Sequence, residues 1–110
     1  MRVEFRLFGD VEACVDGRPV DTGHARQRAV LAALLVDVGR PVPADQLIDR
    51  VWADHPPYRA RNALSAYVSR LRGVLAVDGV QITRGPAGYL LAADPLTVDL
   101  HRFRHLVSRA

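Results

Sequence analysis

Arginines in an acid-poor stretch are the residues of this sequence whose type and spacing could do chemistry. Residues 55–93 hold five arginines and one acidic residue, whereas residues 1–54 hold seven arginines and nine acidic residues. All 15 basic residues are arginine, and the formal net charge is +3. The guanidinium group is a planar fork of donors that fits phosphates and the edge of guanine. This uneven distribution favours a nucleic-acid partner for residues 55–93.

A helix expected over about residues 58–76 carries most of these arginines. Its apolar side chains recur at helical spacing on one face: Ala60, Leu64, Tyr67, Val68, Leu71 and Leu75. The opposite half of the helix carries short, polar and basic residues: Arg59, Asn62, Ser65, Ala66, Ser69 and Arg70. Arg61 and Arg72 stand at the flanks of this half. A solvated helix face usually mixes charges to gain i,i+4 pairs, yet no acidic residue lies between His55 and Val77. Such a face suits a DNA major groove ~12 Å wide, because short side chains allow close approach and long donors reach bases and phosphates.

The elements before this helix are expected to form a small sheet and two helices. Alternation of apolar and polar residues from Val3 to Leu7 predicts a strand, and a second strand is expected over 11–15. Asp16-Gly17 is a hairpin turn before a short third strand at 18–20, which Pro19 confines to an edge. A first helix is expected over 23–38, with Thr22 as its cap, and it should be buried because it is apolar on all sides. A second helix is expected over 44–52.

A β-hairpin is expected after the third helix, with strands at 80–83 and 89–91 and Arg84 at its tip. The resulting order predicts an α+β fold: a winged helix-turn-helix with an N-terminal antiparallel sheet, three helices and a C-terminal β-hairpin wing. In that fold the third helix enters the major groove, and the wing reaches the minor groove or the backbone. The predicted DNA-binding residues are Arg59, Arg61, Asn62, Ser65, Ala66, Ser69, Arg70, Arg72 and Arg84. We assign this domain to residues 1–95.

A last helix is expected from Val98-Asp99 onward, with an apolar stripe that must pack against something: Leu100, Phe103, Leu106 and Val107. His101 and His105 stand four residues apart on it, but without a third ligand this spacing does not make a zinc site. The single cysteine, Cys14, is expected to fill the core, as are Trp52 and Tyr89.

The patterns of other classes of protein are missing from the sequence. Gly85 to Gly88 lacks the lysine and following helix of a phosphate loop, and no spacing suggests a nucleophile and its base. We therefore expect no metal, no cofactor and no enzymatic activity. No apolar run approaches the ~20 residues that span a bilayer, and no secretory segment is evident. We expect a soluble cytoplasmic protein associated with the nucleoid.

The chain resembles the Streptomyces antibiotic regulatory protein family, whose DNA-binding domain is an OmpR/PhoB-type winged helix. The resemblance covers nearly the whole chain and rests on the order and spacing of several short motifs: the residues 26–35, Gly39 to Val42, Leu47-Ile48 with Val51-Trp52, residues 67–72, Gly88 to Leu91, and Val98 to Leu100 with Phe103. Taken singly these motifs are weak. One departure is Pro43, which stands where many members place a serine or threonine cap before the second helix.

The resemblance implies a regulator that activates a gene cluster for the biosynthesis of a secondary metabolite, an antibiotic. It implies binding to direct repeats of double-stranded DNA, by a monomer that pairs head to tail on DNA and helps to recruit RNA polymerase. It places Arg70 and Arg72 at the major groove and its phosphates, and Arg84 on the wing. It places a polymerase-contact loop at Trp52, Asp54, His55 and Tyr58. It implies that residues 96–110 are a linker or the first helix of a truncated helical activation domain.

Two alternatives share the fold. The effector domain of a two-component response regulator would follow a receiver domain, and we expect none because the first strand begins at Val3. A winged-helix protein-interaction module would dock a partner on the third helix, and its binding would be insensitive to salt.

Overall fold

The computed structural model describes residues 2–109, so positions 1 and 110 of the predicted segments 1–95 and 96–110 lie outside the described residues. The chain opens with a three-stranded antiparallel sheet formed by β1 (Val3–Arg6), β2 (Glu12–Val15) and β3 (Arg18–Pro19), in the order β1-β2-β3. Asp16 and Gly17 both have positive φ, 53° and 82°, as a two-residue hairpin turn requires. The predicted N-terminal sheet is confirmed, with Pro19 on its edge strand.

Three helices follow, as predicted: α1 (Ala25–Val36), α2 (Ala44–Trp52) and α3 (Ala60–Val74). The predicted cap of α1 is wrong. Thr22 is buried, and the imidazole Nδ1 of His24 accepts the amide hydrogen of Arg26 at 3.2 Å, so the helix begins two residues later than expected. Helix α2 begins directly after Pro43 without a side-chain cap, and the Pro43 carbonyl accepts the first helical bond, from the amide of Leu47 at 3.0 Å.

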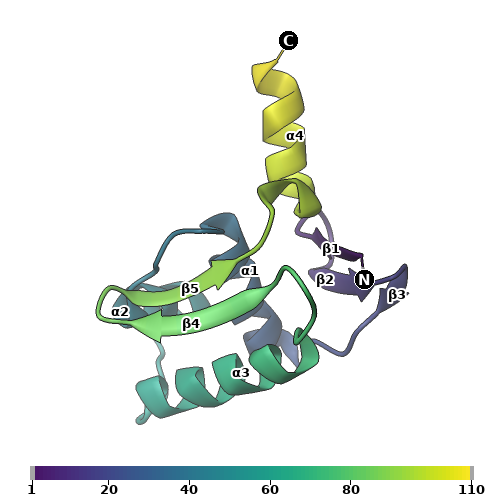
Figure 1. Ribbon diagram of the computed structural model, residues 1–110. Helices are drawn as coiled ribbons and strands as arrows, with labels where there is room; N and C mark the ends of the chain where they lie inside the picture. Colours follow the sequence, from purple (N-terminus) through teal and green to yellow (C-terminus); the bar gives the residue numbers. More distant parts are fainter. Residues whose placement is uncertain (1, 110) are drawn as a thin grey trace.

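The wing is an antiparallel hairpin of β4 (Gln81–Gly85) and β5 (Gly88–Ala92), and β4 passes alongside α3 (Figure 1). Strand β5 is joined to the loop after α1 by backbone hydrogen bonds. The amide of Val42 donates to the Tyr89 carbonyl at 2.7 Å, and the amide of Tyr89 donates back at 2.9 Å. The amide of Gly39 also donates to the Leu91 carbonyl at 2.8 Å. Strand β5 is therefore the inner strand of the wing, tied to that loop, and β4 is the outer strand.

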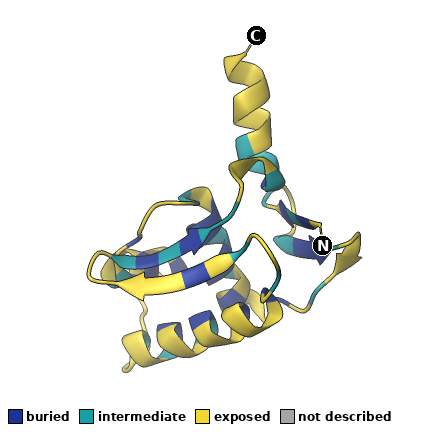
Figure 2. Ribbon diagram, in the orientation of Figure 1, coloured by how far each residue is buried: buried dark blue, intermediate teal, exposed yellow. Residues whose placement is uncertain are grey.

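One hydrophobic core lies between α1, the inner sides of α2 and α3, and the wing (Figure 2). Helix α1 supplies its centre, as the apolar sequence predicted, and five of its hydrophobic residues are buried: Val30, Leu31, Ala33, Leu34 and Leu35. The other elements complete this core with fully buried leucines: Leu47, Leu64, Leu71 and Leu91. Burying such side chains stabilises the fold by ~1.5–3 kcal/mol each.

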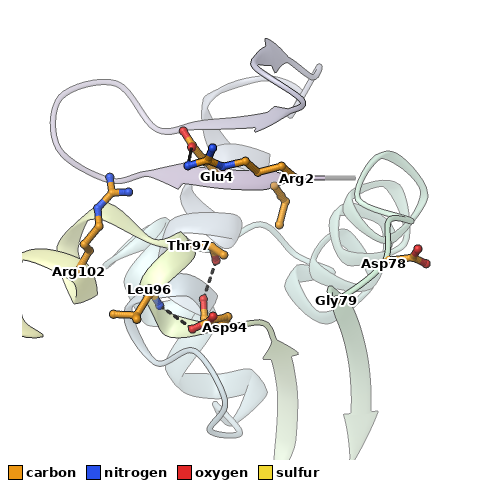
Figure 3. A pocket seen from close by; sticks show the side chains of 9 residues that line it. Arg2, Glu4, Asp78, Gly79, Asp94, Leu96, Thr97 and Arg102 are labelled. Carbon is orange, nitrogen blue, oxygen red and sulfur yellow. Dashed lines mark hydrogen bonds and ion pairs between the residues drawn. The ribbon is translucent and has the colours of Figure 1, made fainter.

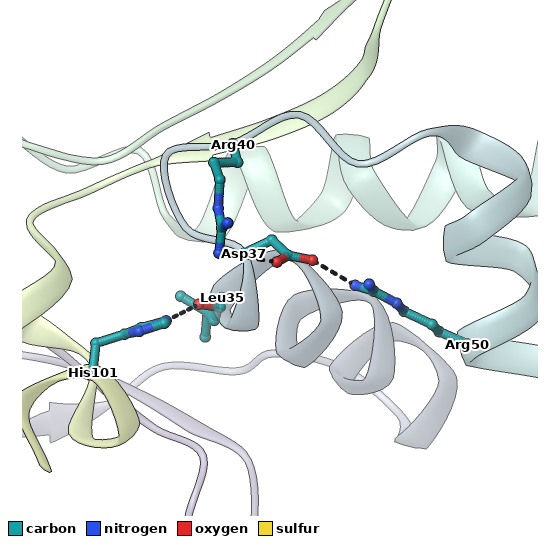
Figure 4. Close-up of polar contacts among 5 residues, drawn as sticks. All are labelled: Leu35, Asp37, Arg40, Arg50 and His101. Carbon is teal, nitrogen blue, oxygen red and sulfur yellow. Dashed lines mark hydrogen bonds and ion pairs between the residues drawn. The ribbon is translucent and has the colours of Figure 1, made fainter. Parts of the chain in front are cut away.

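Polar contacts hold the end of α1 to its neighbours. The Asp37 carboxylate pairs with Arg50 of α2 at 2.8 Å and with Arg40 at 3.4 Å (Figure 4). Near the other end of α1, the Arg26 guanidinium donates to the carbonyl of Val51 at 2.5 Å. The contacts of Arg50 with Asp37 and of Arg26 with Val51 join α2 to α1, and α2 in turn packs against α3.

A 3₁₀ turn (Pro95–Thr97) leads into α4 (Asp99–Ser108), which projects away from the rest of the molecule (Figure 1). Its first turn is anchored. The Asp99 carboxylate accepts the amide hydrogens of Leu7 at 2.7 Å and Phe8 at 3.2 Å. The His101 imidazole donates through Nε2 to the Leu35 carbonyl at 2.8 Å (Figure 4).

The rest of α4 has no cover within the described residues. Phe103, Leu106 and Val107 are 56%, 61% and 57% exposed, and only the half-buried Leu100 joins the core. The Phe103 ring contacts the ring of Phe8 edge to face, with the ring centres 6.0 Å apart. Within residues 2–109 only Leu100, the first residue of this stripe, packs against the core, and the packing partner expected for the other three stays a prediction. No helix within residues 2–109 is long and apolar enough to cross a membrane.

Candidate nucleic-acid interface

Helix α3 presents the two faces that its sequence predicted. Its apolar residues Leu64, Val68 and Leu71 are buried against the core. All eight residues predicted on its polar side are exposed, and Figure 2 shows the outer side of α3 in the colour of exposed residues: Arg59, Arg61, Asn62, Ser65, Ala66, Ser69, Arg70 and Arg72. The small residues Ser65, Ala66 and Ser69 form the centre of this surface. The arginines therefore surround a strip where another molecule can approach the helix backbone closely.

The arginine Arg61 on one flank of α3 has an acidic partner in another element. Its Nη2 lies 2.5 Å from Oδ1 of Asp45, in the first turn of α2. The expectation that this face lacks acidic partners holds within the segment 55–77 but is wrong for Arg61 in the folded chain. The carboxylate is 79% exposed, so water screens the pair and it contributes little stability. Asp45 was missed because the distance along the sequence gives no sign of a contact across two helices.

The flanking Arg72 contacts the wing. Its Nε donates to the carbonyl oxygen of Ile82 in β4 at 3.0 Å. The side chain that the sequence assigned to DNA phosphates therefore also links α3 to the wing.

Arg84 does not lie at the tip of the wing, which corrects the sequence prediction. The register pairs Arg84 with Tyr89 and Gly85 with Gly88, so the turn consists of Pro86 and Ala87. Both strands are longer than predicted, because pairing continues to the glycines that border the turn. The Arg84 guanidinium carbon lies 5.5 Å from the centre of the Tyr89 ring, within the range of a cation–π contact.

A groove of about 260 Å³ lies between the start of α2, α3 and the wing. Asp45, Arg61 and Arg84 line it together with the wing turn. Gly88 at its wall has a φ of +126° and stands against the backbone of Val42, where a Cβ would overlap the Val42 carbonyl. The groove thus brings a wing arginine and an α3 arginine to one side of the molecule.

The loop between α2 and α3 was predicted to contain a protein-contact surface. Asp54, His55 and Tyr58 are exposed, and Tyr58 is 99% exposed. Trp52 is only 7% exposed and stacks on Tyr67 with the ring centres 6.0 Å apart. We therefore remove Trp52 from the contact residues, because the ring packs into the core. Its other interpretation, a core filler, is confirmed, and so are those of Tyr89 and Cys14.

The molecule also has a hollow of about 370 Å³ between β1 and the 3₁₀ turn (Figure 3). Its charged side chains are of both signs, and Arg2 pairs with Glu4 at 3.2 Å. Asp94 accepts the amide hydrogen of Leu96 and caps the turn. These contacts explain Arg2, Glu4 and Asp94 as local structure. No group of three potential metal ligands occurs within residues 2–109.

Residues 18–91 match the family described as "Transcriptional regulatory protein, C terminal". The transcriptional regulatory protein EmbR of Mycobacterium tuberculosis is 41% identical over 106 residues, which is 93% of this chain and 27% of that protein. The regulatory protein AfsR of Streptomyces coelicolor is 39% identical over 108 residues, which is 98% of this chain and 11% of that protein. The chain thus spans only about a tenth to a quarter of the length of these two relatives.

Solved structures agree with this relationship. EmbR of Mycobacterium tuberculosis, solved in complex with a low-affinity phosphopeptide, superposes with a TM-score of 0.86 at 40% identity, over 93% of this chain and 28% of that chain. The DNA-binding domain of CpxR from E. coli has a TM-score of 0.57 at 23% identity, over 74% of this chain and 82% of that chain, which shows a shared fold. The chain therefore belongs to the family of C-terminal, OmpR/PhoB-type winged-helix domains of transcriptional regulatory proteins, and its relatives are regulators of the Streptomyces antibiotic regulatory protein type.

Proposed function

We propose that this chain is the sequence-specific DNA-binding domain of a transcriptional regulator, with α3 in the major groove and the wing on the neighbouring minor groove or backbone. The observation that carries the proposal is the outer face of α3, which is exposed, has no acidic residue of its own and is bordered by arginines. A helix fits into the major groove when the side chains that face the groove are short or can donate hydrogen bonds to bases and phosphates.

The side chains on this surface divide by reach. Ser65, Ala66 and Ser69 allow the helix to approach the bases, and their short side chains suit the floor of the groove. Arg59, Asn62 and Arg70 carry donors for base edges. Arg61, Arg72 and Arg84 stand at the borders, where contacts to phosphates position the protein and do not read the sequence.

We further infer that the full regulator is a non-enzymatic activator of an antibiotic biosynthetic cluster and acts in the cytoplasm on the nucleoid. In this proposal two copies bind direct repeats head to tail, and the exposed Asp54, His55 and Tyr58 contact RNA polymerase. The resemblance to the Streptomyces antibiotic regulatory proteins supports these roles.

We assign residues 1–95 to the DNA-binding domain and residues 96–110 to a linker or to the first helix of a helical activation domain. The exposed apolar face of α4 supports this assignment, because such a face needs a packing partner.

The test is selection of DNA from a random pool, followed by titration of the selected duplex and a scrambled duplex across a salt series. We expect an enriched, directly repeated motif. The logarithm of its binding constant should fall with the logarithm of salt concentration by about 0.9 for each phosphate contact. If no motif is enriched and binding is independent of salt, α3 binds a protein and the proposal is wrong.

A further inference from the structure

The bond between Arg72 and Ile82 joins the two elements that this proposal places on DNA. Arg72 stands near the end of α3, and Ile82 lies in β4, the outer strand of the wing. The Arg72 side chain makes no ion pair with any carboxylate within residues 2–109. Its one hydrogen-bond partner within these residues is the carbonyl of Ile82.

The strand register explains why this carbonyl is free to accept. Ile82 pairs with Leu91, and the carbonyl of Leu91 accepts from Gly39 on the far side of β5. In an antiparallel pair, opposite residues either exchange both backbone bonds or exchange none. Because Leu91 points its carbonyl away from β4, Ile82 points its own away from β5. The Ile82 carbonyl therefore faces the open edge of β4, where Arg72 satisfies it.

The two wing strands are consequently held by different means. Backbone bonds from Gly39 and Val42 fix β5 to the loop after α1. Strand β4 is held by its pairing with β5, by the buried side chain of Ile82 and by Arg72. Arg84 lies two residues beyond Ile82 on the same strand, so the position of β4 sets the position of that guanidinium.

We propose that Arg72 is a positioning residue for DNA binding: its Nε–H holds β4, and with it Arg84, at a set place beside α3. The inference rests on the proposed function and adds a second role to a phosphate contact. A guanidinium has five N–H donors, and one of them binds Ile82, so the others remain available for a phosphate. Holding the wing before DNA arrives reduces the ordering cost of binding.

The first test uses the free protein and amide hydrogen exchange, so its result does not depend on DNA binding. The register places Thr83 and Leu90 in a hydrogen-bonded pair, and their amides report on the wing ladder. We expect Arg72→Ala to speed exchange of these amides about fivefold, the factor expected for one lost hydrogen bond. Arg70→Ala is the matched control, because it removes the same charge from an exposed position on the same helix. Equal exchange in Arg72→Ala and the native chain would overturn the inference, even if DNA binds as proposed.

The second test is a double-mutant cycle of Arg72→Ala and Arg84→Ala, read as affinity for the selected duplex. If Arg72 acts by placing Arg84, the loss caused by Arg84→Ala should be at least about twofold smaller in the Arg72→Ala background, since coupled residues are not additive. Fully additive losses would show that Arg72 is a phosphate contact only. Arg72→Lys, which keeps the charge but has a methylene group in place of the Nε–H that binds Ile82, should resemble Arg72→Ala in hydrogen exchange. If no variant and no native protein binds DNA, the proposed function fails, while the exchange experiment still decides the structural role of Arg72.

Discussion

At the scale of single residues, Gly88 marks the place where the wing meets the loop after α1. Its φ of +126° is a conformation that side chains rarely adopt, and an added Cβ would overlap the carbonyl of Val42. We expect Gly88→Ala to lower the free energy of unfolding by about 1–3 kcal/mol, measured by urea denaturation. Gly85→Ala is the control, since Gly85 lies in the same wing with open space around its Cα. Equal stability of the two variants would show that the wing moves away from Val42 without cost.

Arg70 is exposed on α3 and has no ion-pair partner within residues 2–109, so its guanidinium is available to read a base. We expect Arg70→Ala to weaken binding of the selected duplex by about 1–3 kcal/mol and to reduce discrimination against scrambled DNA. Both affinities are measured at one salt concentration. Arg104→Ala, an exposed arginine on α4, should leave both affinities nearly unchanged. Equal losses on both duplexes in Arg70→Ala would assign this side chain to a phosphate.

At the scale of elements, the hydrogen bonds between α4 and the rest of the domain come from its first turn within residues 2–109. Asp99 accepts hydrogen bonds from the two amides that follow β1, and His101 donates to the last turn of α1. We expect Asp99→Ala to cost about 1–3 kcal/mol, because it leaves the half-buried Leu7 amide without its acceptor. The readouts are urea unfolding and faster hydrogen exchange at Leu7 and Phe8. Asp49→Ala, an exposed acidic residue on α2, is the control, and similar exchange in both variants would contradict the anchoring role.

At the scale of the whole molecule, α3 and α4 lie at opposite ends, so DNA on α3 leaves the apolar face of α4 accessible (Figure 1). We expect a monomer in free solution, since a stable dimer usually buries at least ~1,200 Å². The three exposed residues Phe103, Leu106 and Val107 offer little of that area. Light scattering should report a monomer alone and a pair on DNA that carries two repeats. A stable dimer without DNA would contradict this prediction.

The amino-acid sequence alone determined the elements, their order and the two faces of α3. These properties follow from local patterns, in which apolar residues recur at a period of 3.6 in helices and alternate in strands. The hairpin turn at Asp16-Gly17 was equally local, since two residues with positive φ are enough to specify it. The functional class followed from the same patterns, because the arginines fall on the face of α3 that the apolar stripe leaves outside.

The tertiary structure decided which of those side chains are free and which are engaged. Asp45 meets Arg61, Ile82 meets Arg72, and Trp52 turns inward to stack on Tyr67, and each contact joins separate elements. The place of Arg84 within β4 depends on strand register, which turn residues near it did not determine. Contacts of this kind depend on how helices and strands pack, a property of the whole chain that no window of neighbouring residues contains.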